Sequence, residues 1–119
     1  MGFNSVFRSD LLAGEVGIIT GGGTGIGLAI AKCMLKAGAE KVILVGRREE
    51  VLAEAVAELD ERACYRVQDI ANIPEIEDFS QRLVSEHGAP TCLVHNAGVN
   101  VRKPSVEMSD AEFMSVFDV

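Results

Sequence analysis

The sequence carries a run of glycines at residues 20–27, where a short apolar segment meets a segment with helical spacing. Residues 16–20 are typical of a buried strand, and a helical pattern begins at Gly25. Glycine permits positive φ in a tight turn and lets a ligand approach the backbone. A helix that begins beside such a turn offers free N–H groups and the positive end of its dipole. The run predicts a pyrophosphate-binding turn rather than a plain flexible one, built from Thr20, Gly21, Gly23, Thr24, Gly25, Ile26 and Gly27.

The elements that must position this turn alternate along the chain. Apolar, strand-like runs occupy residues 16–20, 41–45, 64–67 and 91–94, and helical patterns occupy 25–38, 49–61 and 72–88. A further helix opens at 109–112 and continues to Val119. This order predicts an α/β fold with a parallel sheet whose two faces are both covered. The apolar face predicted for the first helix is Ile26, Ile30, Cys33, Met34 and Ala37.

Local signals predict further details of the helices. Asn72 is a candidate N-cap, and Glu75 stands at the capping-box position. His87, just before Gly88, is interpreted either as a favourable cation at the C-terminal end of a helix or as a solvated side chain.

The glycine spacing, Gly-x-x-x-Gly-x-Gly, resembles that of the short-chain dehydrogenase/reductase family. Other segments match the family in the expected order: Asp69 after the third strand, His95-Asn96-Ala97-Gly98 after the fourth, and residues 113–119 in the next helix. The resemblance extends from about residue 12 to 119. It implies a Rossmann-type doubly wound sheet of order 3-2-1-4, truncated after the fourth strand, with a lead-in at 1–14 and an NAD(P)-binding domain at 15–119.

The resemblance also implies roles for individual residues. Asp69 matches the position that hydrogen-bonds the adenine amino group, and Ile70 would flank the ring. Asn96, Ala97 and Gly98 match the segment that fixes the fourth strand and lines the adenosine and ribose side. His95 departs from the family's usual asparagine and is interpreted as a tolerated variant.

The end of the second strand bears on the choice between NADP and NAD. An acidic residue there accepts the ribose hydroxyls of NAD. This chain instead has Gly46 followed by Arg47 and Arg48. Arginine can pair with a 2′-phosphate, so NADP is the preferred cofactor. The alternative is that both arginines are only solvated residues at a helix start.

The family transfers a hydride between nicotinamide and a carbonyl or alcohol carbon, with a Tyr-x-x-x-Lys pair and a serine. The one tyrosine, Tyr65, is followed four residues later by Asp69, so it does not fit that pair. The expectation is therefore a cofactor-binding part of an oxidoreductase, inactive alone and with an unidentified substrate. Complete members are usually homo-oligomers. The alternative is a small non-catalytic protein that binds a nucleotide or pairs with a partner chain.

Length and composition limit the number of domains and the classes of partner. The 119 residues suit one domain, and 11 basic against 18 acidic residues give a net charge of −7. That balance argues against nucleic-acid or anionic-membrane partners. The sequence has no signal-peptide pattern and no apolar run long enough to cross a bilayer, so a cytoplasmic protein is expected. The three cysteines indicate neither a disulfide framework nor a metal site, and each is expected to be a buried small hydrophobe.

Overall fold

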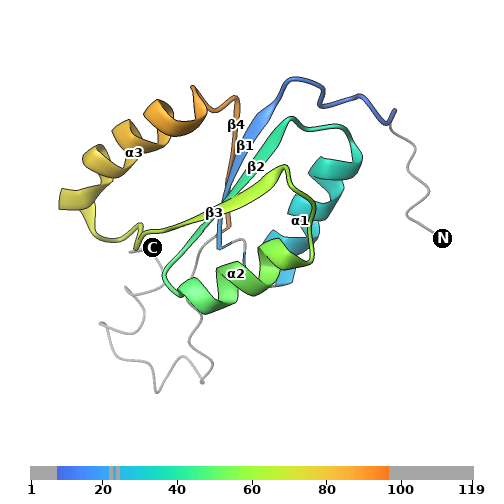
Figure 1. Ribbon diagram of the computed structural model, residues 1–119. Coiled ribbons are helices and arrows are strands. Elements are labelled where there is room, and N and C mark those ends of the chain that lie inside the picture. Colours follow the sequence, from blue (N-terminus) through green and yellow to red (C-terminus); the bar gives the residue numbers. More distant parts are fainter. Residues whose placement is uncertain (1–7, 22, 24, 97–119) are drawn as a thin grey trace, which may run out of the picture.

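Four strands alternate with three helices, as the sequence predicts (Figure 1). The computed structural model describes residues 8–21, 23 and 25–96, so the predicted helix at 109–119 lies outside the described residues. The strands are β1 (Val16–Thr20), β2 (Lys41–Gly46), β3 (Ala63–Val67) and β4 (Cys92–His95). The helices are α1 (Gly25–Lys36), α2 (Glu49–Ala57) and α3 (Ile73–His87).

The sheet is parallel, and its order is β3-β2-β1-β4, which confirms the predicted Rossmann-type arrangement. Val16 aligns with Lys41 of β2, and Gly17 aligns with Cys92 of β4. The chain builds the sheet outward from β1 to β3 and then returns to the other side of β1 for β4. In sheets of this kind a ligand crevice forms at the carboxyl ends of the strands beside this reversal. The glycine turn follows β1 and therefore lies at that point.

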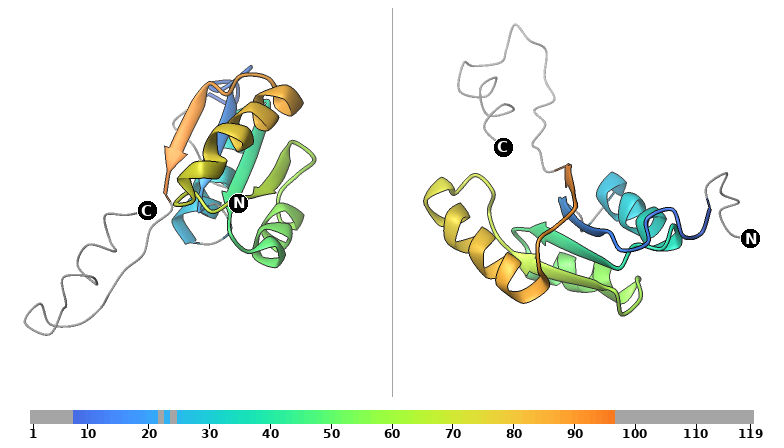
Figure 2. Two further views of the ribbon diagram at one scale, coloured as in Figure 1. Left: turned by 90° about the vertical axis from the view of Figure 1, so that its left-hand side faces the viewer. Right: turned by 90° about the horizontal axis from the view of Figure 1, so that it is seen from above.

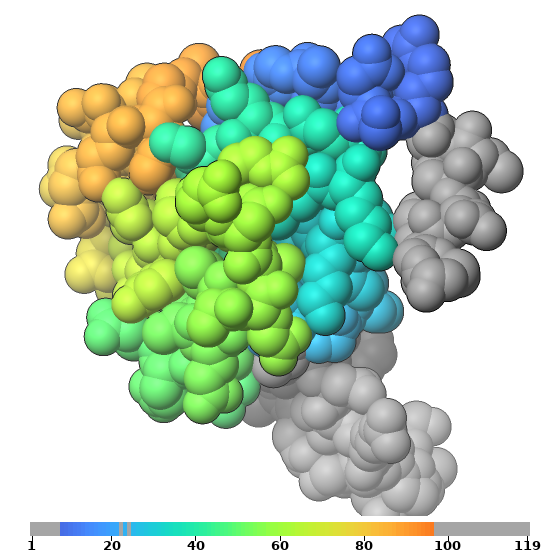
Figure 3. All heavy atoms as spheres, turned by 45° about the vertical axis from the view of Figure 1, so that its right-hand side comes forward, coloured from blue at the N-terminus to red at the C-terminus, as the bar shows by residue number. Residues whose placement is uncertain are grey.

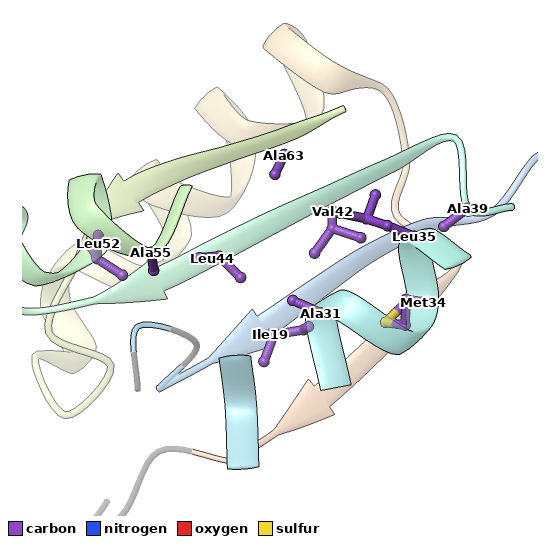
Figure 4. Close-up of a cluster of buried hydrophobic side chains, with 10 residues drawn as sticks. All are labelled: Ile19, Ala31, Met34, Leu35, Ala39, Val42, Leu44, Leu52, Ala55 and Ala63. Atoms are coloured by element: carbon purple, nitrogen blue, oxygen red, sulfur yellow. The ribbon is translucent and has the colours of Figure 1, made fainter. Parts of the chain in front are cut away.

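The two faces of the sheet carry different helices (Figure 1). Side chains alternate along a strand, so Val42 and Leu44 pack with α1 and α2 while Ile43 and Val45 pack with α3. The larger cluster lies between the sheet and the first two helices, as Figure 4 shows: it comprises Ile19, Ala31, Met34, Leu35, Ala39, Val42, Leu44, Leu52, Ala55 and Ala63. This cluster fixes α1 and α2 relative to the strand ends.

The buried face of α1 differs from the predicted one. Its buried residues are Gly27, Ala31, Met34 and Leu35, whereas Ile26 and Cys33 are exposed. The reason is close packing: Met34 lies directly against Gly17 of β1, where a Cβ would collide with its terminal methyl group. Small residues let a helix approach a strand, and a prediction based on side-chain apolarity overlooks them. The prediction of buried cysteines is also wrong, since Cys33 and Cys92 are exposed and Cys64 is half-buried.

Helices pack on both faces of the sheet, as predicted, but the described residues cover the α3 face only in part. A cavity of about 630 Å³ lies between α3 and the strands, and Leu93 on β4 remains 66% exposed. Its lining is largely apolar: Ile18, Thr20, Val45, Ile70, Ala71, Ile73, Ile76, Phe79, Ser80, Leu83, Val84, Pro90, Leu93 and His95. We call this cavity the α3 groove.

The end of α2 and the capping of α3 also differ from the prediction. α2 ends at Ala57 rather than residue 61, because Glu58 N and Leu59 N turn back to the carbonyl groups three residues earlier. Asn72 precedes α3 as expected but makes no side-chain capping bond. The Glu75 carboxylate accepts a hydrogen bond from Gln68 instead of completing a capping box.

The described part of the lead-in, residues 8–14, runs beside the turn between α1 and β2, where it appears as blue atoms against the teal segment in Figure 3. Leu12 N donates to Ala37 O at 2.8 Å, and Ala13 pairs with Ala39 in an antiparallel bridge. This part of the lead-in therefore packs on the side of α1 (Figure 2). Among the described residues, no helix is both long and apolar enough to cross a membrane.

Candidate functional site

The glycine turn between β1 and α1 has the backbone geometry of a phosphate-binding turn. Gly21 and Gly25 adopt φ values of +66° and +57°, in the left-handed region that favours glycine. Gly21 N donates to Val45 O at 2.8 Å, so the turn is tied to the end of β2. A Cβ on Gly25 would meet nothing within 4 Å, so this part of the backbone faces open space.

The start of α1 is favourable for an anion. α1 begins at Gly25 and has no acidic residue in its first turn, so no carboxylate of that turn opposes the positive end of the helix dipole. Ile26 is 71% exposed beside the turn, while Gly27 is buried against the sheet. The residues present thus fit a diphosphate at the turn with an apolar surface beside it. Thr24 was also predicted for this turn and lies outside the described residues.

Asn96 and Thr20 join the end of β4 to the glycine turn. The Asn96 backbone N–H donates to Thr20 Oγ1 at 2.9 Å, and Asn96 Nδ2 donates to Gly21 O at 3.2 Å. Thr20 Oγ1 in turn donates to Val94 O at 3.4 Å. The structure therefore brings together Thr20, Gly21 and Asn96, three residues that the sequence assigned to one site. Ala97 and Gly98, predicted for the same segment, lie outside the described residues.

Arg47 and Arg48 follow β2 at the same edge of the sheet. Both side chains are exposed, and among the described residues neither takes part in an ion pair. Arg48 is the residue before α2 and has an extended backbone, with φ −111° and ψ 109°. The first acidic residues after them, Glu49 and Glu50, already belong to the helix. The end of β2 therefore presents two guanidinium groups and no carboxylate of its own.

Asp69 lies in the loop after β3, and its side chain is exposed. Its Oδ1 accepts a hydrogen bond from Ala71 N at 3.0 Å, a local turn that holds the carboxylate in place. Ile70 packs against the cluster on the α3 face and lines the α3 groove. Asp69 thus stands at the strand-end edge, while Ile70 contributes mainly to the α3 face.

Gln68 orients this loop and was missed by the sequence analysis. It is buried, and its Nε2 donates to Asp69 O and to Glu75 Oε1, both at 3.1 Å. Its backbone N–H donates to Gly46 O at 2.8 Å. Gln68 therefore links the loop that carries Asp69 to the end of β2 and to α3. A single glutamine beside Asp69 has no spacing or pattern that would have indicated this role.

A second polar cluster surrounds His87 where α3 ends, beside the first residue of β2. His87 Nδ1 lies 3.2 Å from Lys41 Nζ, and its Nε2 lies 3.0 Å from Arg66 Nη2 and 3.9 Å from Cys64 Sγ. Burial first, and then the positive charges of Lys41 and Arg66, lower the pKa of His87. The prediction of a favourable helix-end cation is therefore wrong.

The neighbours of His87 share this environment. Arg66 donates to Glu86 Oε2 at 2.6 Å, and this hydrogen bond lowers the pKa of the Glu86 carboxyl. Burial raises the pKa of the Cys64 thiol. Lys41 begins β2, whereas the glycine turn meets the last residues of that strand, so the Lys41 side of this cluster lies at the opposite end of β2 from the candidate site. Tyr65 packs against the core cluster on the other face of the sheet.

The chain is similar in sequence to a dehydrogenase family and to several reductases. The family model described as short chain dehydrogenase matches residues 15–119. A hydroxynaphthalene reductase-like protein Arp2 from Metarhizium brunneum is 33% identical over 111 residues, which cover 91% of this chain and 42% of that protein. A fatty acyl-CoA reductase from Acinetobacter baylyi is 34% identical over 109 residues, covering 89% of this chain and 36% of the relative. The chain thus spans less than half the length of these curated relatives.

Solved structures agree in fold. A variant of actinorhodin polyketide ketoreductase with NADPH has a TM-score of 0.79 and 34% sequence identity, covering 88% of this chain and 41% of that one. The L-sorbose reductase from Gluconobacter frateurii, complexed with NADPH and L-sorbose, has a TM-score of 0.80 and 30% identity, covering 93% and 43%. Both likenesses extend over most of the described residues.

Proposed function

This chain belongs to the short-chain dehydrogenase family, and on that premise we propose that residues 15–119 form the NADP-binding part of an oxidoreductase. The glycine turn holds the pyrophosphate, and Arg47 with Arg48 pairs with the 2′-phosphate. Asp69 accepts a hydrogen bond from the adenine amino group, Ile70 flanks the ring, and Asn96 with Ala97 and Gly98 lines the adenosine side. When bound, the reduced nicotinamide would supply the hydride that converts a carbonyl to an alcohol, and the oxidised nicotinamide would accept it in the reverse direction.

The observation that carries this proposal is the pair of arginines at the end of β2. Arg47 and Arg48 are exposed and lack ion-pair partners among the described residues. The position that would hold an acidic residue in an NAD site is Gly46. A planar guanidinium can donate two hydrogen bonds to a phosphate. The preference for NADP over NAD follows from that arrangement, and the NADPH named for two structural neighbours supports it.

Different residues of this chain have different roles in the proposed complex with NADP. Backbone N–H groups at the start of α1 donate to the diphosphate oxygens. Ile26 shields the cofactor beside the turn from water on one side. Thr20 and Asn96 hold the turn and the end of β4 together through the hydrogen bonds described above. No described residue is assigned to proton transfer, because Tyr65 is half-buried against the core cluster and is followed by Asp69 rather than lysine at the fourth position.

Binding of cofactor fragments tests the proposal without requiring a substrate. Isothermal titration calorimetry of the full chain is expected to give tighter binding of 2′-phospho-ADP-ribose than of ADP-ribose. Arg47→Asp should remove about one to two powers of ten of that preference, the scale of a charge-assisted hydrogen bond. Arg82→Asp is the matched control, since it makes the same charge change at an exposed arginine on α3.

The outcomes separate cleanly. The proposed function is supported if Arg47→Asp lowers the preference for the 2′-phosphate and Arg82→Asp leaves it unchanged. An unchanged preference in Arg47→Asp would refute the assignment of that arginine. Equal binding of the two fragments by the unmodified chain would refute the preference for NADP. Failure to bind either fragment would refute the nucleotide site as a whole.

A further inference from the structure

The glycine turn touches helix α2 as well as its own strand and helix. A Cβ built on Gly23 would lie 2.8 Å from Val51 Cγ1, closer than two carbon atoms can approach without something moving. The next nearest atoms are Leu52 Cδ2 at 3.5 Å and the Val51 carbonyl carbon at 3.6 Å, both ordinary contact distances. One methyl group, that of Val51, therefore occupies the space that a side chain at position 23 would need.

Val51 has little freedom to move aside. It lies in the first turn of α2, and a valine in a helix strongly prefers one χ1 rotamer. Its neighbour Leu52 is only 2% exposed and packs against Gly46 at the end of β2, where a Cβ would lie 3.3 Å from Leu52 Cδ2. Leu52 anchors the helix start in the core, so the position of Val51 is fixed with it. Val51 therefore cannot easily shift to make room for a side chain at position 23.

We propose that Val51 is a positioning residue that holds the phosphate-binding turn through its contact with Gly23. The approach of this helix is by itself a reason for glycine at position 23, and this reason is independent of the cofactor. Gly23 does not adopt a positive φ, in contrast to Gly21 and Gly25, so its backbone conformation alone is open to other residues. The identity of the ligand rests on the proposed function.

The same contact couples the two phosphate-binding regions of the proposed site. Arg47 and Arg48 immediately precede α2, and Val51 lies in its first turn. The 2′-phosphate region and the pyrophosphate turn are therefore joined by a single rigid helix start. Displacing the turn from Val51 should weaken binding of both fragments, with or without the 2′-phosphate, and leave their ratio nearly unchanged. This response differs from that of an arginine substitution, which acts on the ratio.

A rescue experiment tests the contact directly. Gly23→Ala should weaken binding of 2′-phospho-ADP-ribose about tenfold, the scale of forcing one methyl group into a packed contact. Val51→Ala removes the opposing methyl group and should by itself weaken binding only about two- to fivefold. The double variant Gly23→Ala/Val51→Ala should return to within about threefold of Val51→Ala alone, because the remaining atoms leave room for the new Cβ. Gly23→Ala/Val56→Ala is the matched control, since Val56 is a half-buried valine of the same helix that packs on the core cluster.

Thermal unfolding without ligand provides a second, independent readout. Gly23→Ala should lower the unfolding midpoint, Val51→Ala should restore part of the loss, and Val56→Ala should deepen it. If the unmodified chain binds and Val51→Ala fails to rescue Gly23→Ala in both assays, the inference is overturned while the proposed function stands. Unimpaired binding by Gly23→Ala would overturn it as well. If the unmodified chain binds neither fragment, the proposed function fails, and with it the role of Val51 toward a ligand.

Discussion

Replacing Thr20 with valine tests whether the bonds between β4 and the glycine turn support the site. Thr20 is 6% exposed, and its hydroxyl accepts from Asn96 N at 2.9 Å and donates to Val94 O at 3.4 Å. Valine has nearly the same shape but can make neither bond. The Asn96 N–H and the Val94 carbonyl would then lose their hydroxyl partner, while Asn96 would keep its side-chain bond to Gly21.

The expected cost of Thr20→Val can be derived from these contacts. Leaving a buried donor unsatisfied costs about 1–3 kcal/mol. Asn96 is half-buried, so water can partly replace the lost acceptor and the cost falls toward about 1–2 kcal/mol. The bond to Val94 is long, so it contributes little of this. The free energy of unfolding should therefore decrease by about 1–2 kcal/mol, which lowers the midpoint of a domain of this size by roughly 3–10 °C.

Thr20→Ser is the control, because it keeps the hydroxyl and removes one buried methyl group. That loss also costs about 1 kcal/mol, so the two variants should have similar unfolding midpoints. Their ligand affinities should differ: valine should weaken binding of 2′-phospho-ADP-ribose about fivefold, equivalent to about 1 kcal/mol, and serine should not. Equal affinities for the two variants, measured by titration calorimetry, would contradict a role of the hydroxyl in holding the turn.

Two further predictions concern stability. Leu44→Ala should lower the free energy of unfolding by about 2–5 kcal/mol, because Leu44 is fully buried. Leu93→Ala should lower it by less than about 1 kcal/mol, because the Leu93 side chain in the α3 groove is 66% exposed. Urea unfolding measures both losses, and equal losses would refute the assigned burial. The pKa of His87 is lowered from 6.5 by burial and by the charges of Lys41 and Arg66, so the folded protein binds this proton less readily than the unfolded chain. Stability should therefore be complete above pH 6.5 and decline as the pH falls through the lowered value, and His87→Gln should flatten that decline in unfolding curves recorded between about pH 7 and 5; an unchanged slope would show that another group is responsible.

The sequence was sufficient for the order of elements because each boundary has a local cause. The glycine run ends the first strand, and apolar runs of four to six residues indicate the strands. The position of β4 beside β1 follows from the connection rules for parallel sheets. The residues of the glycine turn and Asn96 could be placed at one site for the same reason, since successive parallel strands end at one edge.

The features that could not be predicted depend on contacts between distant residues. The buried face of α1 is set by its close approach to Gly17, which favours Gly27 and Ala31 over the larger Ile26. The lowered pKa of His87 depends on burial and then on the charges of Lys41, 46 positions away, and Arg66, 21 positions away. The bonds of Gln68 to Asp69 and Glu75 could not be predicted from periodicity either, because they are made by a single buried polar side chain in a loop that is largely exposed.

The place of β4 in the sheet also sets an order of events during synthesis. Thr91 N donates to Val16 O, and Val16 N donates to Thr91 Oγ1, both at 2.8 Å across 75 positions of sequence. Val16 meets Lys41 of β2 across only about 25 positions, so closing the β4 ladder costs roughly 1 kcal/mol more in chain entropy. A chain emerging from the ribosome completes β1, β2 and β3 before Thr91 is available. In the nascent chain, the contact between the glycine turn and β2 should therefore form first, and the bonds from Asn96 to the turn should form last.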